Sequence, residues 1–212
     1  MNVYEKMWSG ELYNCADEEL AAEQTRALEL LADYNACRPS EKEKRAALLK
    51  QMFAEIGEGC YIELPFHANW GGKFCHFGKG IYANFNLTLV DDAPIYVGDY
   101  VKFGPNVTVT TAGHPIEPSL RQGVWQYNFP VTIGRNVWIG AGAVILPGVH
   151  IGENSVIGAG SVVTRDIPAN VVAVGAPCRV LREIGEHDRE FYFRGHAIRW
   201  DELELSDSSG VQ

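Results

Sequence analysis

The chain has 212 residues, a formal net charge of -9 at pH 7 and a pI of about 5.1. This acidic balance excludes a general nucleic-acid-binding protein, because neutralising a phosphate backbone requires a basic surface. Hydrophobic residues make up 46% of the chain, and no apolar run reaches the ~18 residues that a membrane-spanning helix needs. We therefore expect a globular protein that binds neither nucleic acid nor a membrane.

Cysteine usage and the N-terminal sequence bear on the cellular compartment. The five cysteines form no paired framework and no CxxC motif, which favours a reducing environment and disfavours a structural zinc site. The first residues, MNVYEKMWSGELY, contain no apolar stretch of the kind that a signal peptide carries. Together these features predict a cytoplasmic protein.

Residues 1–56 differ in pattern from the rest of the chain. Residues 17–37 combine apolar positions at helical spacing with acidic residues in the first turn, and Asp17 stands where the helix would begin. A second helix is predicted to follow, with Ser40 and Glu43 as a capping box. The apolar positions of the two helices are Leu20, Ala27, Leu28, Leu31, Tyr34, Leu48, Leu49, Met52, Phe53 and Ile56. We expect both helices to form a cap on the remaining chain and not a separate domain.

A repeat of six residues begins imperfectly near Ile56 and becomes regular from Ile133 onward. Its successive units are IGRNVW, IGAGAV, ILPGVH, IGENSV, IGAGSV and VTRDIP. A period of six is neither helical nor a simple alternation, and hexapeptide repeats are typical of β-helices. We therefore expect residues 57–181 to form a parallel β-helix, with one short strand and one corner in each hexapeptide.

The first place of each hexapeptide is predicted to point into the coil and to stack on the next coil. These residues are Ile133, Ile139, Ile145, Ile151, Ile157 and Val163. Gly at the second place lets the backbone turn without a Cβ clash. Because burial of one Ile contributes about 1.5–3 kcal/mol, a charge at Ile145 should be far more damaging than a charge at Arg135.

Two segments depart from the repeat. Residues 110–130 interrupt it, and a loop of this length in a compact fold is usually functional or disordered. Trp125, Tyr127 and Phe129 favour an ordered loop. Residues 182–212 follow the repeat, and we expect them to be helical for a turn or two and then frayed.

The chain resembles the hexapeptide-repeat acyltransferases of the maltose and galactoside O-acetyltransferase type, which include nodulation-factor acetyltransferases. The stretches YANFNLTLVDDAPIYVGD, FGPNVT, GHP and NVWIGAGAVILPGV carry the resemblance over nearly the whole chain. It implies a mainly β fold, a left-handed parallel β-helix with an N-terminal helical cap and a long excursion loop. It also implies a homotrimer with active sites at subunit boundaries, acetyl-CoA as the donor, a sugar as the acceptor and no required metal.

The implied reaction moves an acetyl group to a sugar hydroxyl, which is a weak nucleophile and needs a general base. From sequence alone, His114 is equally well interpreted as a structural loop histidine, and the match to the family's GHP motif favours the base. By resemblance, the backbone amide of Ala141 stabilises the oxyanion. Asn84 matches a family position that contacts the acceptor or the catalytic histidine.

The resemblance assigns Asp17, Asn84 and Asp92 to acceptor binding. Each also has an ordinary structural explanation, since Asp17 can start a helix and the other two can occupy corners. The nearby segment NWGGK departs from the family pattern by what looks like one extra residue. Within it, we expect Asn69 or Trp70 to face the acceptor, because an aromatic beside a polar group suits a sugar ring. The departure leaves the identity of the sugar open.

Coenzyme A is expected to lie along the edge of the β-helix, where small residues permit close approach. The resemblance assigns to it Trp138, Ala141, Ala159, Thr164, Arg165 and Arg179. The two arginines suit phosphate groups in an otherwise acidic protein. The alternatives are an ordinary buried or interface aromatic for Trp138 and solvated surface charges for the arginines.

Three other functions stay open at this point. One is an acetyltransferase for another small hydroxyl or an amine. Another is a metal-dependent lyase like the γ-type carbonic anhydrases, which needs three histidines converging on zinc across a subunit boundary; the spacing of the six histidines disfavours it. The last is a purely structural solenoid, which predicts regular coils without the excursion at residues 110–130.

Overall fold

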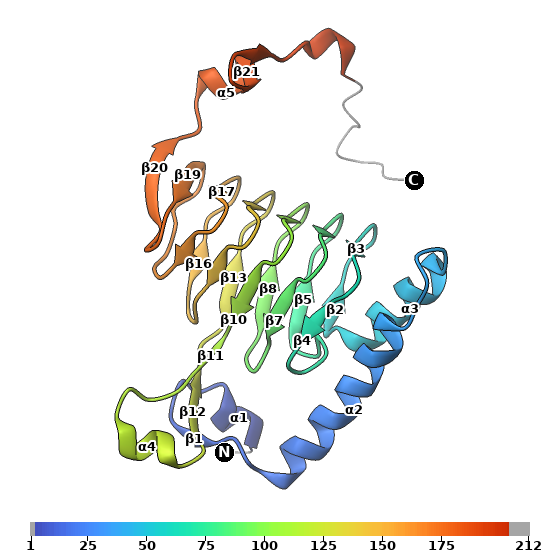
Figure 1. The fold of residues 1–212 in the computed structure, drawn as a ribbon, viewed down its shortest axis with the longest axis vertical. Helices are drawn as coiled ribbons and strands as arrows, with labels where there is room; N and C mark the ends of the chain where they lie inside the picture. Colours follow the sequence, from blue (N-terminus) through green and yellow to red (C-terminus); the bar gives the residue numbers. More distant parts are fainter. Residues whose placement is uncertain (1–2, 204–212) are drawn as a thin grey trace.

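A computed structural model describes residues 3–203 of the chain. Its centre is a solenoid of short parallel strands that wind through three sheets in turn (Figure 1). The parallel β-helix predicted from the hexapeptide repeat is confirmed. The three sheets are called face 1, face 2 and face 3, and each coil passes through them in that order. The corner between faces 2 and 3 is called the 2–3 corner below, and the corner between faces 3 and 1 is called the 3–1 corner.

The three faces are built from strands of two to five residues. Face 1 contains β2 (Glu55–Ile56), β5 (Cys75–Phe77), β8 (Ile95–Val97), β13 (Val131–Ile133) and β16 (His150–Ile151). Face 2 contains β3 (Tyr61–Ile62), β6 (Tyr82–Ala83), β9 (Lys102–Phe103), β14 (Trp138–Ile139), β17 (Val156–Ile157), β19 (Val171–Val174) and β20 (Arg179–Glu183). Face 3 contains β4 (His67–Ala68), β7 (Thr88–Val90), β10 (Thr108–Thr110), β15 (Val144–Ile145) and β18 (Val162–Val163).

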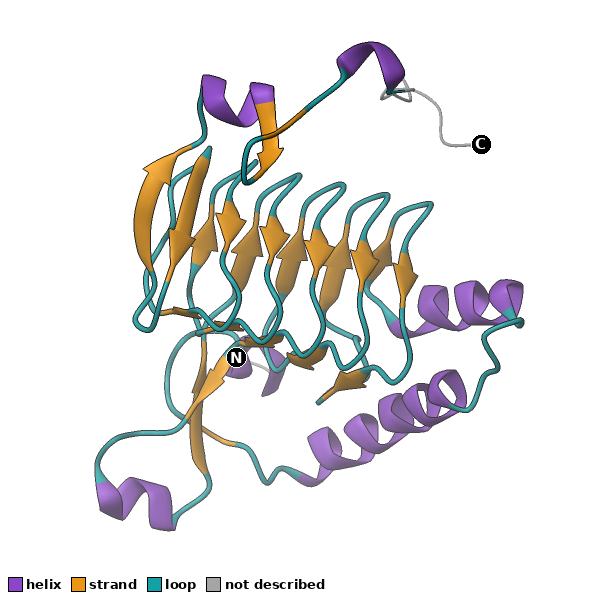
Figure 2. Cartoon of the chain, turned by 45° about the horizontal axis from the view of Figure 1, so that its top comes forward, coloured by secondary structure: helices purple, strands orange, loops and turns teal. Residues whose placement is uncertain are grey.

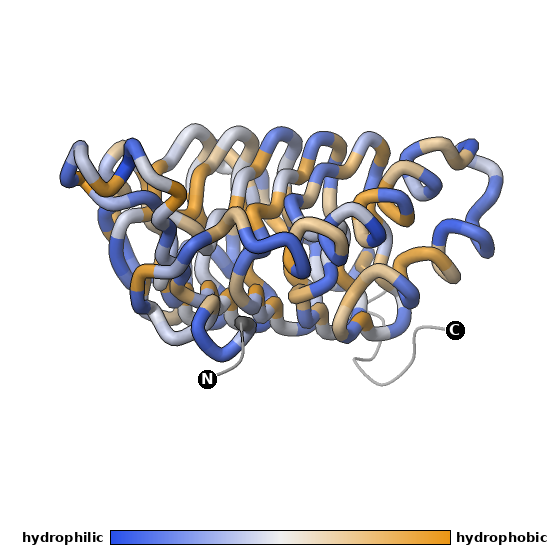
Figure 3. The backbone as a smooth tube through the Cα atoms, turned by 90° about the horizontal axis from the view of Figure 1, so that it is seen from below, coloured by the Kyte–Doolittle hydropathy of each residue, from blue (hydrophilic) through white to orange (hydrophobic). Residues whose placement is uncertain are grey.

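The hydrophobic core runs along the axis of the solenoid. The first-place residues stack in register, as in the pairs Ile133↔Ile151 and Ile145↔Val163. These four side chains are at most 1% exposed, whereas Arg135 is exposed. Figure 3 shows the same alternation along the tube, with short hydrophobic stretches recurring from coil to coil. The inward direction predicted for the first place is confirmed.

Glycine at the second place is required by the neighbouring coil. A Cβ on Gly140 would lie 2.5 Å from the backbone nitrogen of Ala159, so any side chain would push the coils apart. Left-handed turns fall elsewhere in the hexapeptide and include Asn136, Asn154 and Asn170, where φ is 57° to 59°. Asn is one of the few residues that adopt this conformation readily, and these three bond to one another along the corner at 3.1 and 2.9 Å.

Three helices precede the solenoid: α1 (Val3–Met7), α2 (Glu18–Asn35) and α3 (Lys42–Met52). Asp17 caps α2, as predicted from its position. The capping box predicted for Ser40 and Glu43 is wrong. The helix begins one residue later, and the carboxylate of Glu41 instead accepts a hydrogen bond from the backbone N–H of Arg38 at 2.6 Å.

Helices α2 and α3 cover the open end of the first coils (Figure 2). The Tyr34 hydroxyl donates to the carbonyl of Ile62 at 2.6 Å, and Asn35 exchanges two hydrogen bonds with the backbone of Phe66. The guanidinium of Arg45, only 3% exposed, donates to the Tyr61 hydroxyl. An exposed end of a sheet leaves backbone groups unpaired, and these side chains satisfy several of them.

The excursion leaves the solenoid after β10 and is ordered. It contains β11 (Ala112–Gly113), α4 (Pro118–Gln122) and β12 (Trp125–Asn128). Strand β12 pairs on one side with β11 and on the other with β1 (Tyr13–Asn14), which lies before α2. This three-stranded sheet, called the loop sheet below, stands outside the solenoid at the 3–1 corner (Figure 1).

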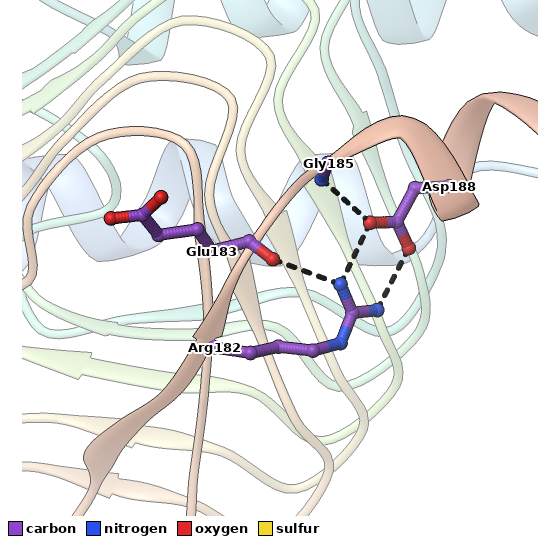
Figure 4. A network of polar contacts seen from close by, with 4 residues as sticks. All are labelled: Arg182, Glu183, Gly185 and Asp188. Carbon is purple, nitrogen blue, oxygen red and sulfur yellow. Dashed lines mark hydrogen bonds and ion pairs between the residues drawn. The ribbon is translucent and has the colours of Figure 1, made fainter.

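The segment after the solenoid is not only helical. Strand β20 folds back antiparallel on β19, and the chain continues through α5 (Glu186–Glu190), β21 (Phe191–Phe193), β22 (His196–Ala197) and η1 (Trp200–Glu202). Arg182 forms two hydrogen bonds with Asp188, which also accepts from the N–H of Gly185 (Figure 4). These bonds hold the pKa of Asp188 well below its usual range. The frayed end predicted from residue 206 onward lies outside the described residues. Within residues 3–203, no helix combines the length and apolarity needed to cross a membrane.

Candidate active site

The carboxylate of Asp92 is the centre of a polar cluster at the 3–1 corner. Its Oδ2 accepts from Asn69 Nδ2 at 2.8 Å, and its Oδ1 accepts from Gln126 Nε2 at 3.1 Å and from Trp70 Nε1 at 3.3 Å. Only 6% of Asp92 is exposed. Three residues predicted to bind the acceptor, Asn69, Trp70 and Asp92, are thus in contact with one another.

The ring of Trp70 is buried. The residue is 3% exposed, and its ring centroid lies 5.2 Å from that of Phe74. A ring buried in this way cannot stack on a sugar, and its Nε1 instead donates to the carboxylate of Asp92. Asn69, in contrast, is exposed. Of the two residues expected to face an acceptor from this segment, Asn69 is the one that reaches the surface.

A second carboxylate, Asp91, fixes the segment that departs from the family pattern. Its oxygens accept from the backbone N–H groups of Trp70 at 2.7 Å and Gly72 at 2.9 Å. Burial raises the pKa of Asp91 to about 7, although the two N–H donors act in the opposite direction. Gly71, with φ of 64°, packs so closely on α2 that a Cβ would lie 2.5 Å from the carbonyl oxygen of Ala27. The segment therefore has one well-defined backbone path.

Asp17 combines its capping role with a free oxygen. Its Oδ1 accepts from the backbone N–H groups of Glu19 at 2.9 Å and Leu20 at 3.2 Å. The other oxygen, Oδ2, has no hydrogen-bond partner among the residues that the structure describes. The helix-cap explanation and the acceptor-binding prediction are therefore compatible, because they use different oxygens.

His114 follows β11 and is exposed at the edge of the loop sheet. Its Nδ1 lies 2.9 Å from the carbonyl oxygen of Trp125 on the neighbouring strand β12. A carbonyl oxygen only accepts, so Nδ1 carries the proton of the neutral ring and Nε2 has a free lone pair. The preceding Gly113 is needed because the ring of Tyr127 packs over it, 2.7 Å from where a Cβ would lie. The backbone thus fixes both the place and the tautomer of this imidazole.

A groove of about 530 Å³ lies on face 2. It is lined by Tyr82, Asn84, Tyr100, Lys102, Phe103, Gly104, Pro105, Asn136, Val137, Trp138 and Ala141. Trp138 is 56% exposed and is therefore not the buried aromatic of the alternative interpretation. The groove brings together three predicted residues: Asn84, Trp138 and Ala141.

Two hydrogen-bond donors at the 2–3 corner are not used in the hydrogen bonds of the described chain. The backbone N–H of Ala141 has no acceptor among residues 3–203, although the N–H groups of Gly140 and Gly142 on either side are both bonded. The side-chain oxygen of Asn84 accepts from the N–H of Phe85 at 2.8 Å, and within the described chain its Nδ2 has no partner. Both groups could therefore donate to a negatively charged oxygen.

The residues predicted to bind coenzyme A continue from this corner toward the C-terminal coils. Ala159 lies one coil beyond Ala141, because β17 pairs in register with β14. Thr164 and Arg165 follow β18 and are exposed. Arg179 is held near them, since the N–H of the preceding residue, Cys178, bonds to the carbonyl of Val162 in β18 at 2.8 Å. Two exposed cations therefore stand at the end of the solenoid that the resemblance assigns to phosphates.

Within one chain, the predicted catalytic and acceptor residues, together with the coenzyme A residues nearest to them, form two groups. The first group surrounds the 3–1 corner and the loop sheet, and consists of Asp17, Asn69, Trp70, Asp92 and His114. The second group lies on face 2 and the 2–3 corner, and consists of Asn84, Trp138, Ala141 and Ala159. Face 3 separates the two corners, and within the described chain no residue of the first group lines the groove on face 2.

Sequence reasoning missed several residues of both groups. Lys102 and Tyr82 lie in the groove because they stand in register with Trp138 across β14, β9 and β6. The six-residue period could have found them, since all three occupy the outward place directly before a first-place residue. Gln126, which binds Asp92, has no such signal, because it lies in the excursion outside the repeat.

Metal chemistry receives no support from the arrangement of ligand-type side chains. Within residues 3–203, no three His, Cys, Asp or Glu side chains are grouped so that they could hold a metal ion. No set of side chains in this part of the chain is therefore suited to hold a resident metal ion.

Comparison with known proteins shows which family has this architecture. The family model described as the maltose acetyltransferase hexapeptide capping motif matches residues 6–57, and that described as bacterial transferase hexapeptide (six repeats) matches residues 130–165. The solenoid and its cap thus define a hexapeptide-repeat acyltransferase.

Several similar relatives are acetyltransferases named for sugar acceptors. The chain is 56% identical to a galactoside O-acetyltransferase of Lactococcus lactis, over 96% of this chain and 98% of the relative. It is 48% identical to that of Escherichia coli, over 93% and 97%. A solved galactoside acetyltransferase in complex with coenzyme A superposes with a TM-score of 0.90 at 48% identity, covering 93% of this chain and 98% of the other. The chain belongs to the maltose and galactoside O-acetyltransferase family, which confirms the family predicted from its GHP and NVWIGAGAVILPGV motifs.

Proposed function

We propose that this enzyme transfers an acetyl group from acetyl-CoA to a hydroxyl of a maltose-, glucose- or galactoside-like sugar, by direct transfer in a ternary complex. The similarity to galactoside O-acetyltransferases, one of them solved with coenzyme A, supports the donor and the acceptor class. The observation that carries the mechanism is the bond between His114 Nδ1 and the carbonyl of Trp125. The enzyme acts in the cytoplasm, where acetyl-CoA is available.

His114 acts as the general base. Its Nε2 takes the proton of the sugar hydroxyl as that oxygen attacks the thioester carbonyl, and the carbonyl of Trp125 stabilises the imidazolium that forms. The tetrahedral intermediate then collapses, the carbon–sulfur bond breaks, and the departing thiolate receives the proton from the imidazolium. No residue of the chain becomes acetylated in this sequence.

The negative charge of the intermediate falls on the former thioester oxygen. The N–H of Ala141 and the Nδ2 of Asn84, which have no acceptor among residues 3–203, line one groove and are the donors that stabilise it. Because the backbone supplies the first donor, an alanine at this position does not weaken the site. Trp138 forms the exposed wall beside them.

The ligands have separate binding groups. Asp17 and Asp92 accept hydrogen bonds from sugar hydroxyls through the acceptor sites that their own contacts leave free, and Asn69 contributes its exposed edge. Coenzyme A lies along the 2–3 corner past Ala141 and Ala159, with Thr164, Arg165 and Arg179 at its phosphates. Small residues at the corner allow the thin pantetheine arm to approach the backbone.

The complete site forms between copies of the chain. His114 and the acceptor residues stand at one corner, whereas Asn84, Ala141 and Trp138 stand at another with face 3 between them. Placing the 3–1 corner of one copy against the 2–3 corner of the next unites both groups, and a closed ring of three copies repeats this contact without a free end. A homotrimer is therefore part of the proposal.

The test is acetyl-CoA-dependent thiol release against maltose, glucose, galactosides and amine acceptors. Sugar-stimulated release is expected in the wild type, reduced by roughly 10²–10⁴-fold in His114→Ala. The matched control is His150→Ala, because His150 is exposed on face 1 and belongs to neither group. Full activity in His114→Ala would reject the base, and stimulation by amines alone would replace the sugar with an amine acceptor.

A further inference from the structure

We propose that Gln126 is a positioning residue that ties the carboxylate of Asp92 to the same strand that orients His114. The inference rests on the proposed function, because it assigns Asp92 to the acceptor and His114 to the base. It concerns a residue outside the hexapeptide repeat, and it explains how the chain keeps an acceptor carboxylate and a catalytic base at a fixed separation.

Strand β12 makes both contacts with adjacent residues. The carbonyl of Trp125 accepts from the His114 ring at 2.9 Å, and the side chain of Gln126 donates to Asp92 Oδ1 at 3.1 Å. Side chains of adjacent strand residues point to opposite faces, and accordingly Trp125 is exposed whereas Gln126 is 8% exposed. One rigid strand therefore holds the base from its backbone and the carboxylate from its inner face.

The strand itself is held on both sides. Gln126 is paired with Tyr13 of β1, and Nε2 of its side chain lies 2.7 Å from the Tyr13 hydroxyl and 2.9 Å from Oδ1 of Asn128. Asn128 is fully buried and donates to the carbonyl of Met7 at 3.0 Å. Among the three acceptors around Nε2, Asp92 alone is a carboxylate, and a bond to a charged acceptor is stronger than one to a neutral acceptor.

Within residues 3–203, the carboxylate of Asp92 accepts hydrogen bonds from three side chains. Asn69 and Trp70 belong to the 3–1 corner, and Gln126 is the one donor that belongs to the loop sheet. A carboxylate offers about four acceptor positions, so three protein donors leave roughly one for a sugar hydroxyl. The orientation of that last position follows from the other three bonds. Without Gln126, the backbone carbonyl of Asp92 would still contact Asn128 of β12 at 3.5 Å, but its carboxylate would be oriented by Asn69 and Trp70 alone among the described residues.

The first test compares the same substitution at two glutamines of the excursion, the buried Gln126 and the exposed Gln122. Gln126→Leu keeps the size of the side chain and removes the donor, whereas Gln122→Leu changes an exposed residue of α4 in the same excursion. A displaced acceptor can lower the rate by up to about 10²-fold. Gln126→Leu is therefore expected to lower kcat/KM for the sugar by about 10- to 100-fold and to leave the KM for acetyl-CoA unchanged. Gln122→Leu should match the wild type.

The second test distinguishes a positioning role from a merely structural one. In Gln126→Glu, the introduced carboxyl can donate to Asp92 only when it is protonated. The activity of this variant, divided by that of the wild type at the same pH, is therefore expected to rise as the pH is lowered. The titratable groups around the position are Asp92, Tyr13, Cys15 and Asp91. The ionised form of the introduced carboxyl also repels the carboxylate of Asp92, which acts in the same direction as the lost hydrogen bond.

The outcomes separate the two proposals. If the wild type shows no sugar-stimulated release, the proposed function fails. If the wild type is active and Gln126→Leu retains its kcat/KM for the sugar, the positioning role is overturned. A pH-independent activity ratio for Gln126→Glu would overturn it as well, and this measurement remains decisive if Gln126→Leu does not fold.

Discussion

Asp91 and Asp92 are consecutive, yet their carboxylates serve different parts of the molecule. The oxygens of Asp91 accept from the backbone N–H groups of Trp70 and Gly72, so this side chain shapes a turn. Within residues 3–203, the donors to the carboxylate of Asp92 are all side chains, including Gln126 of the loop sheet. Of these two neighbouring residues, Asp91 therefore fixes a backbone turn, and Asp92 joins side chains of the 3–1 corner and the loop sheet.

The burial of Asp91 predicts how stability depends on pH. Its pKa rises from 3.8 to about 7 in the folded chain, so the folded state binds this proton more tightly than the unfolded state. The stabilisation is complete below pH 3.8 and is lost as the pH rises through about 7. Asp91→Asn removes the titration, and the free energy of unfolding of the wild type should therefore decrease relative to this variant across that window. Denaturant unfolding over a pH series measures the difference; two curves of constant separation would contradict the assignment.

The contact between coils predicts the cost of a single methyl group. In Gly140→Ala the new Cβ would meet the backbone of Ala159 at 2.5 Å, and backbone atoms cannot move aside as a side chain can. We expect the free energy of unfolding to fall by roughly 1–3 kcal/mol, as for other overpacked sites. Gly185→Ala is the control, because nothing lies within 4 Å of its Cβ position. Equal stability of the two variants would show that the coils can separate without penalty.

The solenoid axis predicts a contrast between the inward first place of the hexapeptide and an outward place. Ile145 is fully buried and Arg135 is exposed. Ile145→Ala should destabilise the fold by about 2–5 kcal/mol through lost burial and a cavity, whereas Arg135→Ala should stay within about 0.5 kcal/mol. Thermal or denaturant unfolding of both variants checks the contrast. A similar loss at both positions would mean that the stacked first places do not carry the core.

The cations at the C-terminal coils predict a selective effect on the donor. Arg165→Ala and Arg179→Ala should each raise the KM for acetyl-CoA by roughly fivefold, as expected for loss of an exposed charge pair of about 1 kcal/mol. The KM for the sugar should not change, because both residues lie away from Asp92. Initial-rate measurements with each substrate varied in turn test this, with Arg135→Ala as the control. An increase in the sugar KM instead would place these arginines elsewhere in the site.

Local repetition explains what could be predicted from the sequence. The inward positions, the 2–3 corner with Ala141 and the GHP corner with His114 each depend on a few neighbouring residues, so a motif is enough to locate them. The contact of Gln126 with Asp92 spans 34 positions outside the repeat, and no short pattern encodes it. The capping box predicted at Ser40 was wrong for a local reason: the neighbouring carboxylate of Glu41 accepts a hydrogen bond from the turn at Arg38, and helix α3 begins after Glu41.

The register of the repeat limited the prediction in another way. It located each coil but not which side chains of different coils form one surface, and so Lys102 was missed although it stands beside Trp138. The C-terminal hairpin of β21 and β22 was also missed, since among residues 3–203 its two strands pair with each other and follow no period. Prediction from sequence was therefore strongest along the solenoid axis and weakest where separate segments meet.

The pairing of β1 with β12 makes the loop sheet depend on the N-terminal segment of the chain. Tyr13 and Gln126 are 113 positions apart, so during synthesis on the ribosome Tyr13 emerges long before its partner exists. Helix α2 can already dock on the first coils through Tyr34 and Asn35 and keep the N-terminal strand near the place where the loop will arrive. Because β1 forms one edge of the loop sheet, a bulky fusion placed ahead of it is expected to disturb the loop sheet before it disturbs the solenoid.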